Sequence, residues 1–258
     1  MTVVPIHVTS RDNPQLQLLR KLARDGAAYR KLGQIWLEGD HLCSAFLVRG
    51  GKPMLAVMTE IAWSDDRLRG LASQASKVLV VKDELFVGLS TLESPAKMGF
   101  VLEHRTALKL QPAVPSVVLD RLQDAGNVGT ILRSAAALGV SQILAVKGTA
   151  ALWSPKVLRA GMGAHFGLNL VEGLSVADLT GLNLPMVATS SYAEKTINQL
   201  ALPQPCAWVF GHEGQGVGAE LMQACAHQVR IPQPGGEESL NVASAAAICF
   251  YEALRQSL

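Results

Sequence analysis

The chain has 258 residues, of which 49% are hydrophobic and 17% charged, and its formal net charge is +2 at pH 7. This composition is typical of an ordinary globular protein with one large domain or two modest ones, and the net charge is too small to identify a partner. No stretch has the roughly 18 consecutive apolar residues of a membrane span, and the N-terminus lacks a basic segment followed by an apolar run, so we expect a cytoplasmic protein.

The first predicted element is a helix over residues 13–31. Its apolar residues recur at helical spacing: Leu16, Leu19, Leu22 and Ala23. A cationic stripe occupies the other side: Arg20, Lys21, Arg24 and Lys31. The stripe contributes to an uneven charge distribution, because residues 1–110 carry 15 Lys and Arg against 11 Asp and Glu, whereas residues 111–258 carry 8 against 10. A solvated helix face is the simpler interpretation of the stripe, and contact with a nucleic-acid backbone is the alternative.

Short strands and helices then alternate up to residue 104, which predicts a small α/β domain. We expect strands within 34–39, 54–60, 77–82 and 98–104, and helices near 40–49, 65–75 and 82–90. Two prolines between apolar runs mark the following segment as a linker, placed at 106–114. We therefore predict an N-terminal domain over 1–105 and a second domain over 115–258.

The second domain shows another alternation of strands and helices. We expect strands within 117–120, 142–147, 185–190, 206–211 and 227–232, and helices near 127–139, 155–163, 175–182, 218–225 and 241–256. The alternation predicts a mostly parallel sheet covered on both faces, with ligands beyond the carboxyl ends of its strands. The four cysteines are far apart and lack a C-x-x-C spacing, which argues against a zinc site or a disulfide framework.

Polar residues follow three of these strands. After the first, Asn127 is either a helix N-cap or a ligand-facing amide, and Arg133 is a lone cation on an otherwise apolar helix. After the fourth, a glycine-rich turn holds Glu213, but its order of glycines is not that of a dinucleotide-binding loop or a P-loop, and His212 and Glu213 lack the second histidine of H-E-x-x-H. After the fifth, Ser239 and Asn241 precede the last helix, where either can cap it or bind something at its N-terminus.

These three segments resemble motifs one, two and three of the SpoU/TrmH family of RNA ribose 2′-O-methyltransferases, in the SPOUT superfamily. The matching stretches, in chain order, are DAGNVGTILRSAAALG, VFGHEGQGVGAEL and IPQPGGEESLNVASAAAICFYE. Residues 10–50 also resemble the RNA-binding domain that precedes the catalytic domain in many members. The chain departs from the usual motifs at Ala125, often a proline, and at His212, often an asparagine.

The resemblance implies a SPOUT parallel-sheet domain with a deep trefoil knot that binds S-adenosylmethionine. It also implies a homodimer that packs the last helix and the motif-one region across a two-fold axis, which would explain why that helix has no wholly polar face, given Ala245, Ile248, Phe250 and Tyr251. Carried over by motif, the cofactor contacts are Thr189, Gly211, Ile231 and Leu240, largely through backbone groups. The residues assigned to catalysis are Asn127, Arg133, Glu213, Ser239 and Asn241. No metal is required. RNA, ribosomal or transfer, is the implied substrate, and Arg20, Lys21 and Arg24 are the expected contacts to its backbone.

Arg133 is the residue that the family assigns to the ribose hydroxyl. A guanidinium stays protonated at neutral pH, so we expect Arg133 to stabilise the developing alkoxide and anchor a phosphate rather than to accept the proton. Two other functions remain open. A catalytically inactive RNA-binding protein of the same fold would act in ribosome assembly, and a nucleotide-dependent oxidoreductase would bind nicotinamide, although the fingerprint for that cofactor is missing.

Overall fold

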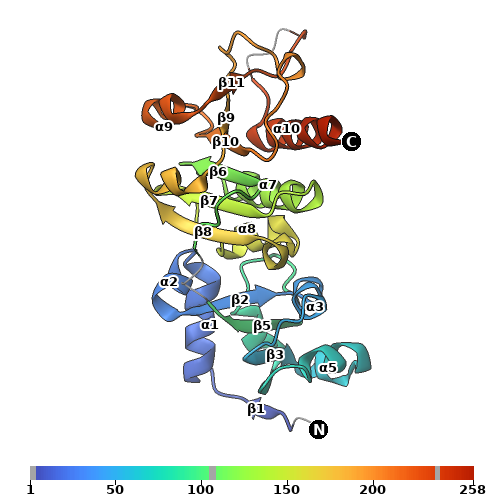
Figure 1. The fold of residues 1–258 in the computed structure, drawn as a ribbon. Helices are drawn as coiled ribbons and strands as arrows, with labels where there is room; N and C mark the ends of the chain where they lie inside the picture. Colours follow the sequence, from blue (N-terminus) through green and yellow to red (C-terminus); the bar gives the residue numbers. More distant parts are fainter. Residues whose placement is uncertain (1–3, 105–108, 236–238) are drawn as a thin grey trace. The chain divides into compact units, whose positions relative to one another are not determined.

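The computed structural model describes residues 4–104, 109–235 and 239–258. The chain divides into two compact units, one formed by Met1–Ala107 with Trp153–Phe166 and the other by Leu108–Leu152 with Gly167–Leu258. Each unit has its own sheet (Figure 1). Residues 105–108 and 236–238, which belong to the predicted domain boundary and to the third motif, lie outside the described residues. The functional division at residues 106–114 stays a prediction.

The first unit is built on a mixed sheet with the strand order β1-β4-β3-β5-β2. In chain order its strands are β1 (Ile6–Val8), β2 (Gln34–Glu38), β3 (Leu55–Thr59), β4 (Val78–Val81) and β5 (Met98–Glu103). β5 runs antiparallel to β2 and β3, whereas the other neighbouring strands are parallel. The helices are α1 (Pro14–Arg24), α2 (Ala28–Leu32), α3 (Asp40–Val48), α4 (Glu60–Ser64), α5 (Asp66–Ala72), α6 (Asp83–Val87) and α8 (Pro155–Gly161). The α/β character predicted for this part is confirmed.

The predicted helix over 13–31 is two helices, α1 and α2. Asp25 ends α1 in an extended conformation, with φ −98° and ψ 108°, and its carboxylate accepts the backbone N–H of Ala27 at 2.9 Å. This local hydrogen bond offers the backbone an alternative to the helix and so breaks it. The predicted apolar face is correct, because Leu16, Leu19, Leu22 and Ala23 are all buried.

Helix α8 lies in the sequence of the second predicted domain but groups with the first unit. Arg159 of α8 forms an ion pair with the buried Glu38 of β2, with 4.0 Å between Nη1 and Oε2. The Phe46 and Phe166 rings also meet edge to face, 5.1 Å apart. Segment 153–166 therefore completes the core of the first unit.

The second unit is a parallel sheet with the strand order β11-β9-β10-β6-β7-β8, which confirms the predicted parallel sheet. Its strands are β6 (Ser116–Asp120), β7 (Gln142–Val146), β8 (Asn169–Leu174), β9 (Met186–Thr189), β10 (Ala207–Gly211) and β11 (His227–Val229). Its helices are α7 (Ala125–Ala137), α9 (Ala219–Ala224) and α10 (Val242–Ser257), with the 3-10 helices η2 (Ala177–Leu182) and η3 (Ile197–Gln199). The 3-10 helix η1 (Ala164–Gly167) ends the segment of the first unit and leads into β8. The trefoil knot stays a prediction.

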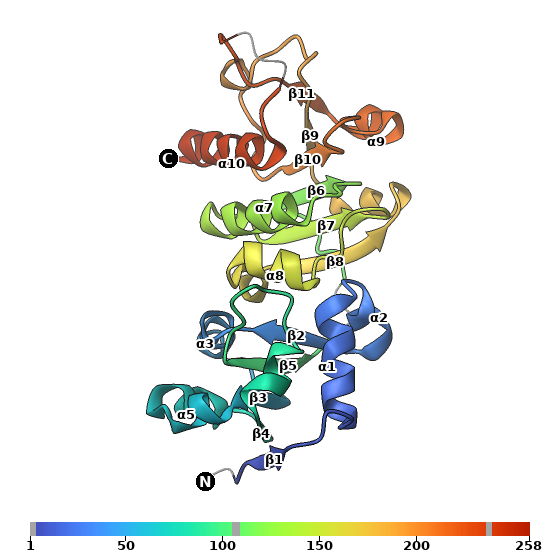
Figure 2. The ribbon, with the colours of Figure 1, turned by 180° about the vertical axis from the view of Figure 1, so that it is seen from behind.

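Helices cover both faces of this sheet, as expected. α7 and α10 lie together on one face (Figure 2). On this face Phe250 of α10 packs edge to face on Phe210 of β10, with 5.7 Å between the ring centroids. α9 and η2 cover the other face through Leu221, Leu179 and Leu182, which join a cluster of buried strand residues. Side chains that alternate along buried strands therefore supply two apolar layers.

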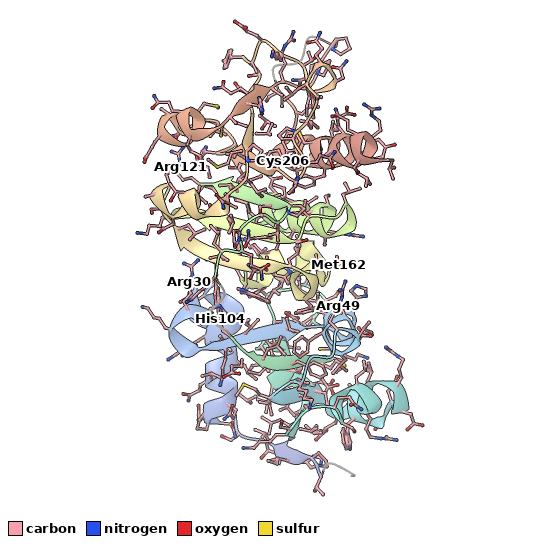
Figure 3. The ribbon with its side chains drawn as sticks, viewed as in Figure 1. Arg30, Arg49, His104, Arg121, Met162 and Cys206 are labelled. Carbon is pink, nitrogen blue, oxygen red and sulfur yellow. The ribbon has the colours of Figure 1, made fainter. Side chains whose placement is uncertain are left out.

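Strand register aligns the polar ends of the motifs. Gly211, at the end of β10, is paired with Asp120, at the end of β6, and Val229 of β11 is paired with Thr189 of β9. Because these strands are parallel, their carboxyl ends meet at one edge of the sheet. Cys206, directly before β10, marks the opposite edge, while Arg121 directly follows β6 (Figure 3).

The four cysteines are free thiols, and Cys43, Cys206 and Cys249 are buried. Burial raises the pKa of Cys206 to about 11. Among the described helices, none combines the length and hydropathy that crossing a bilayer requires. The cytoplasmic location stays a prediction.

Candidate active site

The turn between β6 and α7 leaves the side chain of Asn127 available for contacts with other segments. Asp124 is the N-cap of α7, because its carboxylate accepts the Asn127 backbone N–H at 2.7 Å. The interpretation of Asn127 as a helix cap is therefore wrong. Asn127 lies in the first turn of α7, half-buried, where its amide can point away from the helix axis.

Asn127 joins all three motifs. Its Nδ2 donates to Glu213 Oε1 at 3.3 Å, and its Oδ1 accepts from Asn241 Nδ2 at 2.9 Å. Asn241 also caps α10, since its Oδ1 accepts the backbone N–H groups of Ala243 and Ser244 at 2.9 and 3.3 Å. Three of the five residues assigned to catalysis thus form one chain of hydrogen bonds, although they come from segments separated by 86 and 114 residues.

Glu213 is held as a carboxylate by the turn of motif one. Its Oε2 accepts the Gln123 backbone N–H at 3.2 Å, and its Oε1 accepts that of Asp124 at 3.1 Å. Burial raises the pKa of Glu213, but the hydrogen bonds from backbone N–H groups and from Asn127 outweigh it, so the net pKa lies below the ordinary glutamate value. Glu213 is therefore ionised at neutral pH and acts as a hydrogen-bond acceptor rather than as a proton carrier.

The loop that carries Glu213 turns back sharply on the end of β10. His212 O accepts the Gly216 N–H at 2.8 Å, and Gly216 has a φ of 68°. A Cβ on Gly211 would lie 2.1 Å from Gly216 C and from Val217 N, so only glycine fits at position 211. The close approach that Gly211 permits is to the backbone of its own loop, and its contact with a cofactor stays a prediction.

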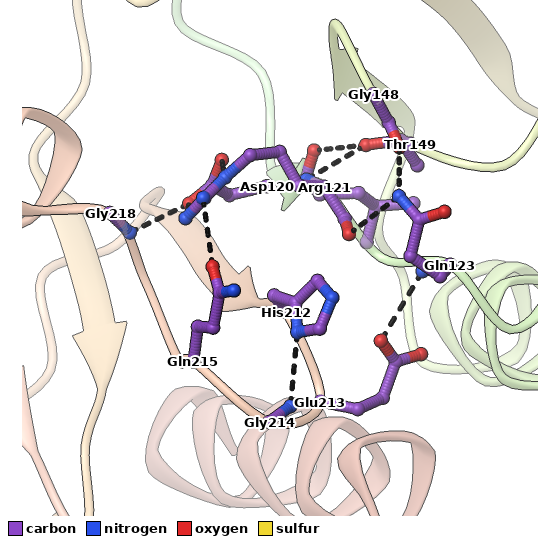
Figure 4. Close-up of polar contacts among 11 residues, drawn as sticks. Asp120, Arg121, Gln123, Gly148, Thr149, His212, Glu213, Gly214, Gln215 and Gly218 are labelled. Atoms are coloured by element: carbon purple, nitrogen blue, oxygen red, sulfur yellow. Dashed lines mark hydrogen bonds and ion pairs between the residues drawn. The ribbon is translucent and has the colours of Figure 1, made fainter.

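A second set of contacts links motif one to the same loop, and sequence reasoning missed it. Asp120, at the end of β6, pairs with Arg121 and accepts the Gly218 N–H at 2.7 Å, while Arg121 Nη1 donates to Gln215 Oε1 at 3.3 Å (Figure 4). This pairing raises the pKa of Arg121. The available signal was an acidic residue at the end of a buried strand with a basic residue directly after it. Their partners in the loop, however, lie 94 residues away for Gln215 and 98 for Gly218.

Arg133 and Ser239 are both exposed and do not join the Asn127 cluster. Within residues 4–104, 109–235 and 239–258, neither side chain has a hydrogen bond or an ion pair in the structure. Arg133 is six residues beyond Asn127 on α7, which turns it by about 120° around the helix from Asn127 at roughly 100° per residue. Its guanidinium is therefore available to a ligand, and the roles of both residues stay predictions.

The predicted cofactor contacts lie at the carboxyl edge of the sheet and in the chain that follows β11. Thr189 and Ile231 are half-buried, and Leu240 is exposed. Thr189 Oγ1 is 3.5 Å from the Val209 carbonyl oxygen. In the segment after Ile231, Gln233 Oε1 is buried and has no hydrogen-bond partner among the residues that the structure describes. Such an acceptor fits a ligand that brings its own N–H or O–H donors.

In the first unit, the cationic stripe lines a cavity of about 610 Å³ formed by α1 and α2. The lining residues are Arg20, Lys21, Arg24, Asp25, Ala28, Lys31 and Leu32. Arg20 is partly buried and its Nη1 donates to the Arg11 carbonyl at 2.8 Å, whereas Lys21, Arg24 and Lys31 are exposed. The helix break at Asp25 turns the stripe into a concave surface with four cations and one carboxylate.

Known proteins resemble the chain along nearly its whole length. An uncharacterised tRNA/rRNA methyltransferase of Synechocystis sp. is 34% identical over 96% of this chain and 93% of the relative. A 23S rRNA (guanosine(2553)-2′-O)-methyltransferase of Bacillus subtilis is 28% identical over 86% of this chain and 88% of the relative. The crystal structure of an AdoMet-bound rRNA methyltransferase from Sinorhizobium meliloti superposes with a TM-score of 0.84, at 26% identity and 98% coverage of both chains.

The model of the SpoU rRNA methylase family matches residues 115–251, which include all three motifs. This match confirms the resemblance drawn from the motifs, and the likeness of the solved structures confirms the α/β fold class. The chain belongs to the SpoU rRNA methylase family.

Proposed function

We propose that this protein is an enzyme that methylates a ribose 2′-hydroxyl in ribosomal or transfer RNA, with S-adenosylmethionine as the methyl donor. The observation that carries the proposal is the hydrogen-bonded chain Asn241–Asn127–Glu213, which joins the three motifs of the family in one place. The relatives named for rRNA 2′-O-methylation and the AdoMet-bound neighbour support both the reaction and the cofactor.

The residues present fit S-adenosylmethionine. Gln233 Oε1, which is buried and has no partner within the described part of the chain, is an acceptor for an amine or a hydroxyl, and the cofactor carries both. Thr189, Gly211, Ile231 and Leu240 would hold the cofactor where the strands and loops of the sheet end. When bound, it supplies an activated methyl group.

The protein must also align the ribose with the methyl group and help its 2′-hydroxyl to lose a proton. A guanidinium is a hydrogen-bond donor without an acceptor site, so we assign Arg133 to the negative charge that develops on O2′ and to the adjacent phosphate. The proton leaves to phosphate or water. Asn127 and Glu213 fix the turn from which α7 begins, and Ser239 and Asn241 position the ribose or the cofactor.

The N-terminal unit supplies the RNA contact in this proposal. Four cationic side chains line its cavity, and the arrangement of α1 and α2 places them on a concave surface, whereas a solvated helix would present them as a flat stripe. Cations that contact phosphates release counterions, so binding through this surface depends on salt. Arg20, Lys21 and Arg24 are the contacts that we assign to the RNA backbone.

We further assign homodimer formation to α10. Its inner side is buried, with Phe250 packed on Phe210, so Phe250 belongs to the core of its own chain. Its outer side nevertheless carries Ile248 and Tyr251, which are 40% and 60% exposed. Because these two residues lie one helical turn apart, they form an apolar surface that a second copy would cover. Tyr251→Asp should turn a dimer into a monomer in analytical ultracentrifugation.

Two measurements test the activity. Calorimetry should detect binding of S-adenosylmethionine, and tritium from its methyl group should then enter bulk RNA. An inactive RNA-binding protein of the same fold would bind RNA without transferring the label. That outcome, with the purified chain folded, would replace the enzyme proposal by a role in ribosome assembly.

A further inference from the structure

Arg121 has an unusual backbone conformation for an arginine. It directly follows β6 with a φ of 58°, in the left-handed region that costs a non-glycine residue about 1 kcal/mol or more. Such a conformation persists where side-chain contacts hold it. Arg121 has several: Nε and Nη2 donate to the two carboxylate oxygens of Asp120 at 3.0 and 3.1 Å, and the backbone N–H donates to Thr149 Oγ1 at 3.1 Å.

The same pair holds the loop of motif two. Asp120 is only 3% exposed, and its Oδ2 also accepts the Gly218 N–H at 2.7 Å. Arg121 Nη1 reaches Gln215 Oε1 at 3.3 Å. A Cβ at Gly218 would lie 3.1 Å from Arg121 Nη2, so the glycine leaves room for the guanidinium.

Loop 211–218 is therefore tethered at two places. Glu213 accepts the N–H groups of Gln123 and Asp124 on one side. The Asp120–Arg121 pair holds Gln215 and Gly218 on the other, and Figure 4 shows these two contacts together with the one between Glu213 and Gln123. His212 lies between the two tethers in the figure. The Glu213 tether is part of the family motifs, whereas the Asp120–Arg121 tether adds a bidentate ion pair with a fixed geometry.

We infer that Arg121 is a positioning residue that, together with Asp120, keeps loop 211–218 in the conformation that binds the methyl donor. The inference rests on the proposed function, because it takes this loop as part of the cofactor site. Arg121 acts through the loop: its guanidinium is already occupied by Asp120 and Gln215, so it is a support for the site rather than a group that touches the substrate.

The decisive variant is Arg121→Gly. Glycine adopts a positive φ without strain, so the variant loses the guanidinium and relieves the backbone. It also leaves the buried Asp120 carboxylate without its cation, so the melting temperature should fall. If the untethered loop is competent to bind for about one-tenth of the time, the apparent Kd for S-adenosylmethionine rises about tenfold. The kcat at saturating cofactor should stay within about twofold, and the amides of 211–218 should exchange with deuterium faster.

Two further variants and a control complete the experiment. Gln215→Leu removes one contact of Arg121 without changing the backbone or the buried carboxylate, and it should raise the Kd by a smaller factor, about two- to threefold, as expected for one hydrogen bond. Arg121→Lys keeps the charge but loses the bidentate geometry, so it should fall between wild type and Arg121→Gly. Asn183→Gly is the matched control, because Asn183 is an exposed residue at φ 54° that ends η2.

The inference is overturned if Arg121→Gly and Gln215→Leu bind the cofactor as wild type does, with unchanged exchange of loop 211–218. It is equally overturned if Gln215→Leu, which keeps the Asp120–Arg121 pair, raises the Kd only together with a loss of kcat and of melting temperature, because that result would indicate a role in stability alone. If Arg121→Gly fails to fold, the Kd, kcat and deuterium exchange measured for Gln215→Leu test the inference instead. If wild type itself binds no S-adenosylmethionine, the proposed function fails, and the exchange of the loop amides still tests the tether.

Discussion

Replacement of Glu213 by glutamine isolates the charge that joins motif two to motif one. The carboxylate accepts three hydrogen bonds, from Asp124 N, Gln123 N and Asn127 Nδ2, at 3.1 to 3.3 Å. Glutamine keeps the shape but turns one acceptor into a donor, which faces a backbone N–H. Hydrogen bonds to a charged group contribute about 1.5–3 kcal/mol when buried. Glu213 is exposed, so we expect a loss of about 1–2 kcal/mol, or about 2–8 °C in melting temperature.

The assay is thermal unfolding at neutral pH, with Glu220→Gln as the control. Glu220 is exposed in the first turn of α9, and its replacement should shift the melting temperature much less. A double-mutant cycle with Asn127→Ala should give a coupling energy of about 0.5–1 kcal/mol, because the two side chains are in direct contact. Equal melting temperatures for Glu213→Gln and wild type, with zero coupling, would refute the account of this cluster.

Three other outcomes follow from the site and the cavity. Folding lowers the pKa of Glu213, so the contribution of this carboxylate to stability is complete above the ordinary glutamate pKa and is lost as the pH falls through the lowered value. The difference in melting temperature between wild type and Glu213→Gln should therefore shrink on acidification. Arg133→Ala should lower kcat by about 10²–10³-fold, and Arg133→Lys should recover only part of the lost rate. If Arg133→Lys kept a near-wild-type rate and Arg133→Ala lost only RNA affinity, the role of Arg133 at the alkoxide would be excluded. Neutralising the three cations of α1 (Arg20, Lys21 and Arg24) should reduce the slope of the logarithm of the RNA-binding constant against the logarithm of the salt concentration by up to about 2 for single-stranded RNA. An unchanged slope would show that the cavity does not contact RNA.

The elements that could be predicted are those with strong local patterns. Continuous apolar runs bounded by turns identified β6, β7, β9 and β10, and parallel pairing then places their ends at one edge, where Asn127, Glu213 and Asn241 meet. Strands with weak patterns were missed. β8 contains Glu172 and Gly173, and β1 is only three residues long at the end of its sheet, so neither shows a clear period.

Other features depend on contacts that local sequence does not encode. The grouping of residues 153–166 with the first unit rests on the pairing of Arg159 with Glu38, which is 121 residues away in the chain. The Asp120–Arg121 pair has a recognisable composition, but its partners in the loop of motif two appear only when β6 and β10 are aligned side by side. Arg133 was identified as a cation on an apolar helix, and its exposure leaves its role to experiment.

The most direct test of the proposed reaction is nucleoside mass spectrometry of RNA incubated with the purified protein and S-adenosylmethionine. The account predicts one 2′-O-methylated nucleoside, absent when Arg133→Ala replaces the wild type. A methyl group found on a base, or an equal yield of 2′-O-methyl nucleoside from the Arg133→Ala protein, would contradict it.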